Sequence, residues 1–262
     1  GRLDEGSSVT LDVSPFIRVR SGARPLIALH GLGGSSSQSM ALLNGAVLDQ
    51  HDVVAPDLRA HGTNEMPFDD GRMSFAALAD DVRVLVDSVG FDEPPLLMGV
   101  SMGAGVALQL QDEPERFAGV LLVRPAWAWT GHPSNLDAFP VMASLLGRYP
   151  VAEARQRFLS SDTYAGISAI SPAAAVALLA QFDERHGVER RARLTAMPAD
   201  APRRPIYPVL GFVLGTPLDP VHPLELAEQV ALDIGATFEL APPRYNEPEA
   251  HRAAIASALS RL

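Results

Sequence analysis

A serine set between glycines, where an apolar stretch meets a run of small helix-forming residues, constrains this chain more than any other feature. The segment Gly99-Val100-Ser101-Met102-Gly103 follows the apolar run 94–98 and precedes the helix-compatible stretch 104–111. A strand that turns sharply into a helix through small residues lifts a serine hydroxyl clear of the sheet. This context predicts Ser101 as a candidate nucleophile, and it disfavours the alternative of a serine that only caps the following helix.

Strand-like and helix-like segments alternate along most of the chain, which is typical of a mostly parallel sheet with helices on both faces. The pattern predicts an opening hairpin over residues 9–19. Further strands are expected over residues 25–29, 52–55, 96–98, 119–123, 209–214 and 237–240. Apolar residues at helical spacing predict a helix over 74–89 with Ser74 as its N-cap, and closing helices over 223–233 and 248–262. The predicted fold class is therefore α/β.

Residues 131–204 break this alternation, because the stretch is rich in Ala, Arg and Pro and contains no clear strand. We expect a core made of residues 1–130 and 205–262, with 131–204 inserted as a helical lid. An insertion at this point should rise over the carboxyl ends of the strands, where ligands bind in open α/β sheets. Both tryptophans lie at its root, so substrate-binding roles are predicted for Trp127, Trp129 and His132.

Residue usage excludes several kinds of chemistry. The chain of 262 residues has no cysteine, and all 21 of its basic residues are arginine. Disulfides, thiolate nucleophiles, Cys-ligated metals and lysine Schiff bases are therefore excluded. A net charge of -10 argues against binding to nucleic acid or to anionic membranes. We expect a small-molecule substrate and neither a metal nor another cofactor, while the sequence leaves the oligomeric state open.

Apolar runs in the sequence are short and interrupted, so no membrane span is predicted. Residues 1–4 also lack the apolar core of a signal peptide. We expect a cytoplasmic protein, with a leader removed ahead of residue 1 as the alternative.

Three motifs, in this order, resemble those of the α/β-hydrolase fold superfamily. They are His30-Gly31-Leu32-Gly33-Gly34 after the strand 25–29, Asp57-Leu58-Arg59-Ala60-His61-Gly62, and the serine segment 99–103. The resemblance covers nearly the whole chain. It implies that the backbone N–H groups of Leu32 and Met102 form an oxyanion hole, which needs two donors aimed where negative charge develops.

The resemblance also indicates where the partners of the serine should lie. Asp219, just after the strand 209–214, matches the family's triad carboxylate, and its alternative role is an Asp-Pro turn that caps the next helix. The family's histidine should lie in the loop 241–246, which contains none. His222 and His251 are the two candidates to replace it. We favour His222, because catalytic groups gather in loops at the carboxyl edge of a sheet.

The remaining histidines are expected to be structural or solvated. In the family, the histidines that match His30 and His61 orient loops by hydrogen bonding. His51 and His186 lie in segments typical of exposed loops or of the lid. A metal site built from Asp219 and His222 is disfavoured, because the sequence offers no third ligand beside them.

Two hypotheses about function follow from these residues. The first is a serine hydrolase or acyl-transfer enzyme that acts on an ester, lactone or thioester of a small, fairly apolar molecule. In it, Ser101 attacks, His222 moves the proton and Asp219 orients the imidazole. The second is a non-hydrolytic cyclase, lyase or ligand-binding protein, whose oxyanion donors polarise a carbonyl without a covalent intermediate.

Overall fold

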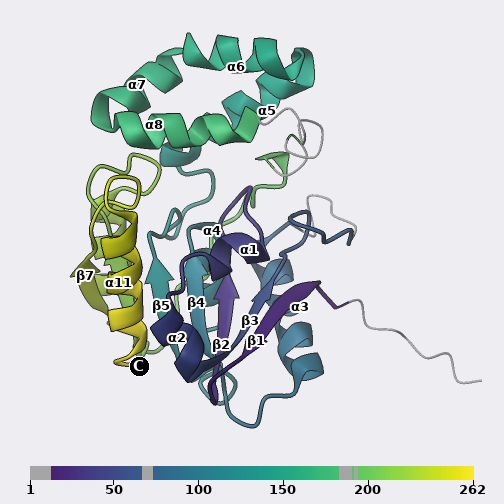
Figure 1. The fold of residues 1–262 in the computed structure, drawn as a ribbon, viewed down its shortest axis with the longest axis vertical. Helices are drawn as coiled ribbons and strands as arrows, with labels where there is room; N and C mark the ends of the chain where they lie inside the picture. Colours follow the sequence, from purple (N-terminus) through teal and green to yellow (C-terminus); the bar gives the residue numbers. More distant parts are fainter. Residues whose placement is uncertain (1–12, 67–72, 183–190, 192–193) are drawn as a thin grey trace, which may run out of the picture.

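A seven-stranded sheet forms the centre of the molecule, in the order β1-β3-β2-β4-β5-β6-β7 (Figure 1). The structure is a computed structural model that describes residues 13–66, 73–182, 191 and 194–262. The strands are β1 (Phe16–Arg20), β2 (Arg24–Leu29), β3 (His51–Pro56), β4 (Leu96–Val100), β5 (Gly119–Val123), β6 (Gly211–Gly215) and β7 (Thr237–Leu240). Every neighbouring pair from β3 to β7 is parallel. The predicted α/β fold with a mostly parallel sheet is confirmed.

The edge strand β1 departs from the sequence-based expectation of an opening hairpin. It pairs antiparallel with β3, so that Phe16 lies opposite Pro56 and Arg20 opposite Asp52. Residues 13–15 form no strand, and residues 9–12 lie outside the described residues. β1 therefore pairs with the free edge of β3, a strand distant in sequence, and not with its neighbour in the chain. The guanidinium of Arg18 binds the carboxylate of Asp52 across this pair at 2.6 Å.

Helices cover both faces of the sheet, and successive residues of a strand serve opposite faces. In β2, Ile27 and Leu29 pack on the side of α3 (Phe75–Val89), α4 (Met102–Gln109) and α10 (Leu224–Ile234). Leu26 and Ala28 pack on the side of α2 (Gly45–Gln50) and α11 (Pro248–Leu259). Burial on both faces explains why the central strands read as continuous apolar runs.

Capping residues determine where α3 begins and ends. The side chain of Ser74 accepts a hydrogen bond from the backbone N–H of Ala77 at 3.1 Å, as expected for the predicted N-cap. At the other end, Gly90 takes a left-handed conformation with φ of 62°. The predicted closing helices are confirmed: α10 begins at Leu224 and α11 at Pro248, against predicted starts at residues 223 and 248.

A layer of helices lies between β5 and β6 in the sequence and above the carboxyl ends of the strands in space (Figure 1). It comprises α5 (Ala138–Arg148), α6 (Val151–Leu159), α7 (Asp162–Ile170) and α8 (Pro172–Leu178), flanked by the 3-10 turns η1 (Ser134–Leu136) and η2 (Leu179–Phe182). The short helix α1 (Ser36–Met40) follows the loop after β2. The insertion is thus helical over 134–182, and its predicted limits at 131 and 204 stay a prediction.

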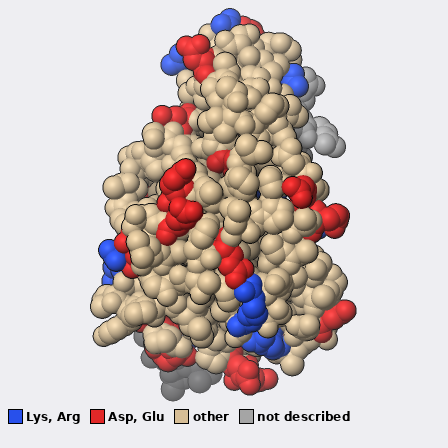
Figure 2. Space-filling view, turned by 90° about the vertical axis from the view of Figure 1, so that its left-hand side faces the viewer, with Lys and Arg blue, Asp and Glu red and all other residues tan. Residues whose placement is uncertain are grey.

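Acidic side chains are scattered over the surface rather than gathered in one patch on the face shown in Figure 2. Among the described helices, none is long and apolar enough to cross a membrane.

Candidate active site

Ser101 occupies a sharp turn between β4 and α4, with φ of 54° and ψ of -110°. Two glycines make the turn possible. A Cβ atom on Gly99 would lie 2.3 Å from the carbonyl oxygen of Gly103, and one on Gly103 would lie 2.5 Å from that of Leu29. The backbone N–H of Ser101 donates to the carbonyl of Val123 at 3.1 Å. Close packing of the helix start against the sheet therefore holds Ser101 in a conformation that non-glycine residues seldom adopt.

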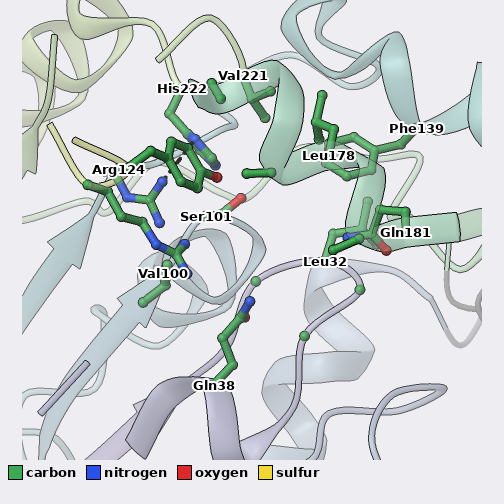
Figure 3. Close-up of a pocket in the computed structure, with 18 of the residues that line it drawn as sticks. Leu32, Gln38, Val100, Ser101, Arg124, Phe139, Leu178, Gln181, Val221 and His222 are labelled. Carbon is green, nitrogen blue, oxygen red and sulfur yellow. Dashed lines mark hydrogen bonds between the residues drawn. The ribbon is translucent and has the colours of Figure 1, made fainter. Parts of the chain in front are cut away.

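Ser101 lines a cavity of about 420 Å³ at the carboxyl end of the sheet. Figure 3 shows the serine between two groups of side chains, with Arg124 and His222 on one side and Phe139 and Leu178 on the other. The first group comes from the core and the second from the helical insertion. The cavity is therefore polar toward one wall and mostly apolar toward the insertion, where Gln181 is a polar exception.

Asp219 and His222 form a buried pair in the loop after β6. The imidazole Nδ1 lies 2.8 Å from Asp219 Oδ2, and the backbone N–H of His222 donates to the carbonyl oxygen of Asp219 at 3.1 Å. With Nδ1 held by the carboxylate, Nε2 is the ring nitrogen left for another group. His222 lines the cavity together with Ser101. The two candidates that the sequence placed 121 positions apart thus share one site.

The electrostatic surroundings keep this pair in a defined state. Burial disfavours the charged carboxylate, but the contacts with His222 and Arg124 outweigh it and hold the pKa of Asp219 well below its usual range. Burial lowers the pKa of His222, and Arg124 adds to this while Asp219 opposes it. A neutral imidazole beside an ionised carboxylate can accept a proton.

In the described part of the chain, no hydrogen bond joins His222 to the hydroxyl of Ser101. Catalytic contacts of this kind often tighten only when substrate binds.

Arg124 was not singled out by the sequence as a site residue. Its side chain is 1% exposed, its φ is 49°, and its Nη1 donates to Asp219 Oδ2 at 2.9 Å. Nη1 also lies 3.4 Å from Nδ1 of His222. One feature of the sequence could have pointed to Arg124. It directly follows the fully apolar strand β5, so its side chain is expected either in the core or at the site.

The loop after β7, where the resemblance implied a histidine, contributes Arg244 and Tyr245 to the cavity. Arg244 is partly buried, and burial together with nearby Arg124 lowers its pKa. Its carbon Cζ lies 5.5 Å from the centre of the Tyr245 ring.

His251 lies apart from the serine. It is fully buried on α11, its Nδ1 donates to the carbonyl of Pro242 at 2.9 Å, and burial lowers its pKa to about 4. It lines a second cavity of about 350 Å³ rather than the one that holds Ser101. The two cavities share Gln38, Arg244 and Tyr245 in their walls.

The three residues predicted to bind substrate do not line the cavity that holds Ser101. Trp127 is buried with its ring edge-on to Phe75, at 5.3 Å between centroids. The indole N–H of Trp129 donates to Asp233 at 2.7 Å, and His132 is exposed. The insertion reaches the cavity through other side chains, among them Phe139, Ala177, Leu178 and Gln181.

Leu32 lines the cavity, and Met102 begins α4 directly after the serine. The first N–H groups of a helix have no partner within the helix, so the Met102 N–H can donate a hydrogen bond to an oxygen of a ligand. Their pairing as an oxyanion hole stays a prediction.

The other histidines hold backbone. His30 Nε2 accepts from the N–H of Leu58 at 3.0 Å, and His61 Nδ1 lies 2.8 Å from the carbonyl of Arg59. The expectation of a solvated His51 is wrong, because this residue begins β3, is 1% exposed and has its Nδ1 2.8 Å from the carbonyl of Val47. His186 lies outside the described residues.

Comparison with known proteins identifies the class of fold. The model of the family described as alpha/beta hydrolase fold matches residues 24–160, and the chain belongs to that family. Among curated proteins, Protein ABHD8 of Bos taurus is 29% identical over 122 residues, which are 46% of this chain and 28% of that protein. The protein Rv2715 of Mycobacterium tuberculosis is 30% identical over 92 residues, 35% of this chain and 26% of that protein. The matched region thus spans little more than a quarter of these relatives.

Solved structures match over almost the whole chain. The structure of Rv0554 of Mycobacterium tuberculosis matches with a TM-score of 0.69 at 20% identity, and the match covers 95% of this chain and 94% of the Rv0554 chain. A thermophilic esterase of Thermogutta terrifontis has a TM-score of 0.63 at 21% identity, with 94% and 93% covered. Est816, an enzyme that degrades N-acyl homoserine lactone, has a TM-score of 0.62 at 16% identity, with 95% and 96% covered. At these identities the likeness establishes the fold.

Proposed function

We propose that this chain is a serine hydrolase or acyl-transfer enzyme that acts on an ester, lactone or thioester of a small molecule with a largely apolar body. The observation that carries the proposal is the buried Asp219–His222 contact of 2.8 Å, in the wall of the cavity that Ser101 lines. Membership of the alpha/beta hydrolase fold family supports it. The similarity in fold to an esterase and to a lactone-degrading enzyme agrees with this reaction class.

In the proposed reaction, Ser101 Oγ attacks the carbonyl carbon while Nε2 of His222 accepts the hydroxyl proton. The carbonyl oxygen becomes negative, and the N–H groups of Leu32 and Met102 stabilise it. When the C–O or C–S bond breaks, His222 returns the proton to the leaving alcohol or thiol, and the acyl group stays on Ser101. Attack by water or another acceptor, again deprotonated by His222, releases the acyl group and restores the serine.

Asp219 acts on this reaction through His222. Its carboxylate fixes the ring so that Nε2 is the free nitrogen, and it stabilises the imidazolium formed on attack. Arg124 limits that effect, because its Nη1 donates to the same carboxylate oxygen that His222 contacts.

A pair of substitutions tests the mechanism with short p-nitrophenyl esters. Ser101→Ala and His222→Ala should each lower kcat by about a thousandfold or more, because residues that act as a unit lose nearly all of their effect when one is removed. Far-UV circular dichroism serves as the control for folding. Wild-type protein should also be labelled by a fluorophosphonate, and Ser101→Ala should not. Turnover that persists in Ser101→Ala would contradict a covalent mechanism.

A second candidate is a non-hydrolytic cyclase, lyase or ligand-binding protein. The specific observation that favours it is the sharing of Asp219 Oδ2 between Arg124 and His222, which weakens the support that the carboxylate gives to the imidazole. For such a protein, wild-type chain would resist the fluorophosphonate, and Ser101→Ala would keep full activity or ligand affinity.

A further inference from the structure

Two arginines line the cavity that holds Ser101, although the chain as a whole is acidic. Arg124 comes from the end of β5 and Arg244 from the loop after β7. The whole chain carries 31 acidic against 21 basic residues. Among the described residues that line this cavity, none is an aspartate or a glutamate. The positive charge of the cavity is therefore a local property of the site and not a consequence of composition.

Asp219, beside the cavity, offsets only one of these charges. Its carboxylate accepts one hydrogen bond from Arg124 and lies against Nδ1 of His222. Within the described part of the chain, Arg244 has no carboxylate within ion-pair distance, and its guanidinium lies near the ring of Tyr245. With a neutral imidazole, two guanidinium groups and one carboxylate leave one positive charge in excess.

An excess charge in a partly enclosed site is stabilised by a ligand of opposite charge. Arg124 also keeps a buried Nε atom with no hydrogen-bond partner among the described residues. Guanidinium groups present several N–H donors in a plane, which matches the two oxygens of a carboxylate.

We propose that Arg244, together with nearby Arg124, forms a carboxylate subsite, so that the preferred substrate is an ester, lactone or thioester that also carries a free carboxylate. This inference rests on the proposed function and names its substrate class. The apolar body of such a substrate lies against Phe139 and Leu178, across the cavity from Arg124 (Figure 3).

The test compares two esters of similar length, the p-nitrophenyl monoester of glutaric acid and p-nitrophenyl valerate. Wild-type protein should show a higher kcat/KM for the charged ester. Arg244→Gln should lower the ratio of the two kcat/KM values by about tenfold or more, the effect typical of losing a hydrogen bond to a charged group. Arg244→Lys should recover part of the ratio, because it restores the charge without the planar pair of donors.

Arg252→Gln is the matched control. Arg252 lies on α11, is paired with Glu249, and lines the second cavity but not the one that holds Ser101. Its removal changes the net charge equally and should leave the ratio unchanged. A ratio that falls as far in Arg252→Gln as in Arg244→Gln would overturn the subsite in favour of a general charge effect.

Binding to Ser101→Ala separates this inference from the proposed reaction. Calorimetry with glutarate should detect binding that Arg244→Gln weakens by about tenfold or more. If neither ester is turned over but glutarate binds in this way, the subsite stands and the proposed hydrolysis fails. If both esters are turned over equally well and glutarate does not bind, the hydrolysis stands and the subsite is overturned.

Discussion

Asp219 serves two neighbours through one oxygen. Nη1 of Arg124 and Nδ1 of His222 lie 2.9 and 2.8 Å from Oδ2, and all three side chains are buried. The carboxylate thus offsets the charge of a buried arginine while it orients the imidazole. This double role separates His222 from His251, whose Nδ1 is held by a backbone carbonyl and whose surroundings contain no such carboxylate contact among the described residues.

His251→Asn tests whether the buried histidine on α11 is structural. The unfolded chain binds a proton on this histidine below a pKa of about 6.5, whereas the folded chain binds it only below about 4. Between these values protonation favours the unfolded state, so the free energy of unfolding of wild-type protein should fall as the pH drops from 6.5 toward 4.

Asparagine keeps a side-chain N–H donor near the position of Nδ1 but cannot titrate. The loss of stability between pH 7 and pH 5, measured by urea unfolding, should therefore be smaller in His251→Asn than in wild-type protein, by up to about 1.4 kcal/mol per pH unit. Its esterase activity at pH 7.5 should stay within a few-fold of wild type. An activity loss as severe as that of His222→Ala would transfer the role of base to His251.

Elements with strong local signals were predicted closely from the sequence, whereas contacts made over long separations were not. The strands β5 and β7 match their predicted ranges, and α3 begins directly after its predicted cap. The serine turn was readable because glycines are needed where backbones approach closely. The positions of Arg124 and Arg244 in the site were not readable, because they depend on the cavity wall and on a carboxylate 95 residues from Arg124.

The tryptophans illustrate the same limit. The left-handed conformation of Arg124 turns the chain just after β5. Trp127 then packs against Phe75 in the core instead of facing the cavity. The sequence pattern indicates that Trp127 lies at the start of the insertion, but it does not indicate whether its side chain faces the core or the cavity.

Because the turn between β4 and α4 is tightly packed, we expect an alanine there to lower stability, in contrast to an alanine at an open helix position. A Cβ atom on Gly103 would meet the backbone carbonyls of Leu29 and His30, which cannot move without shifting β2. Gly103→Ala should lower the free energy of unfolding by about 1–3 kcal/mol, as overpacking does. Gly166→Ala is the matched control, because its Cβ would have open space within α7 and alanine favours a helix by about 1 kcal/mol. Urea unfolding measures both, and equal stability of the two variants would contradict the tight packing at the turn.

The described residues form two apolar cores, one on each face of the sheet, and the helical insertion packs into one of them. Phe158 on α6 and Phe182 in η2 are buried in the same cluster as Ile27 of β2 and Phe75 of α3. The insertion is therefore packed into the molecule and not merely tethered to it. This packing places Phe139 and Leu178 in the apolar wall of the cavity, opposite Arg124 and His222 of the core.

Gln38, Arg244 and Tyr245 line both the cavity that holds Ser101 and the second cavity, so these three residues lie between the two. The two cavities have volumes of about 420 and 350 Å³. Replacing the tyrosine ring with a methyl group should open one continuous channel without touching the reacting groups. We expect Tyr245→Ala to raise kcat/KM for p-nitrophenyl octanoate relative to the butyrate, whereas exposed Tyr207→Ala leaves that preference unchanged. An unaltered preference in Tyr245→Ala would contradict a role of this ring in separating the two cavities, whereas the expected change would make a single aromatic side chain the boundary between short and long acyl chains.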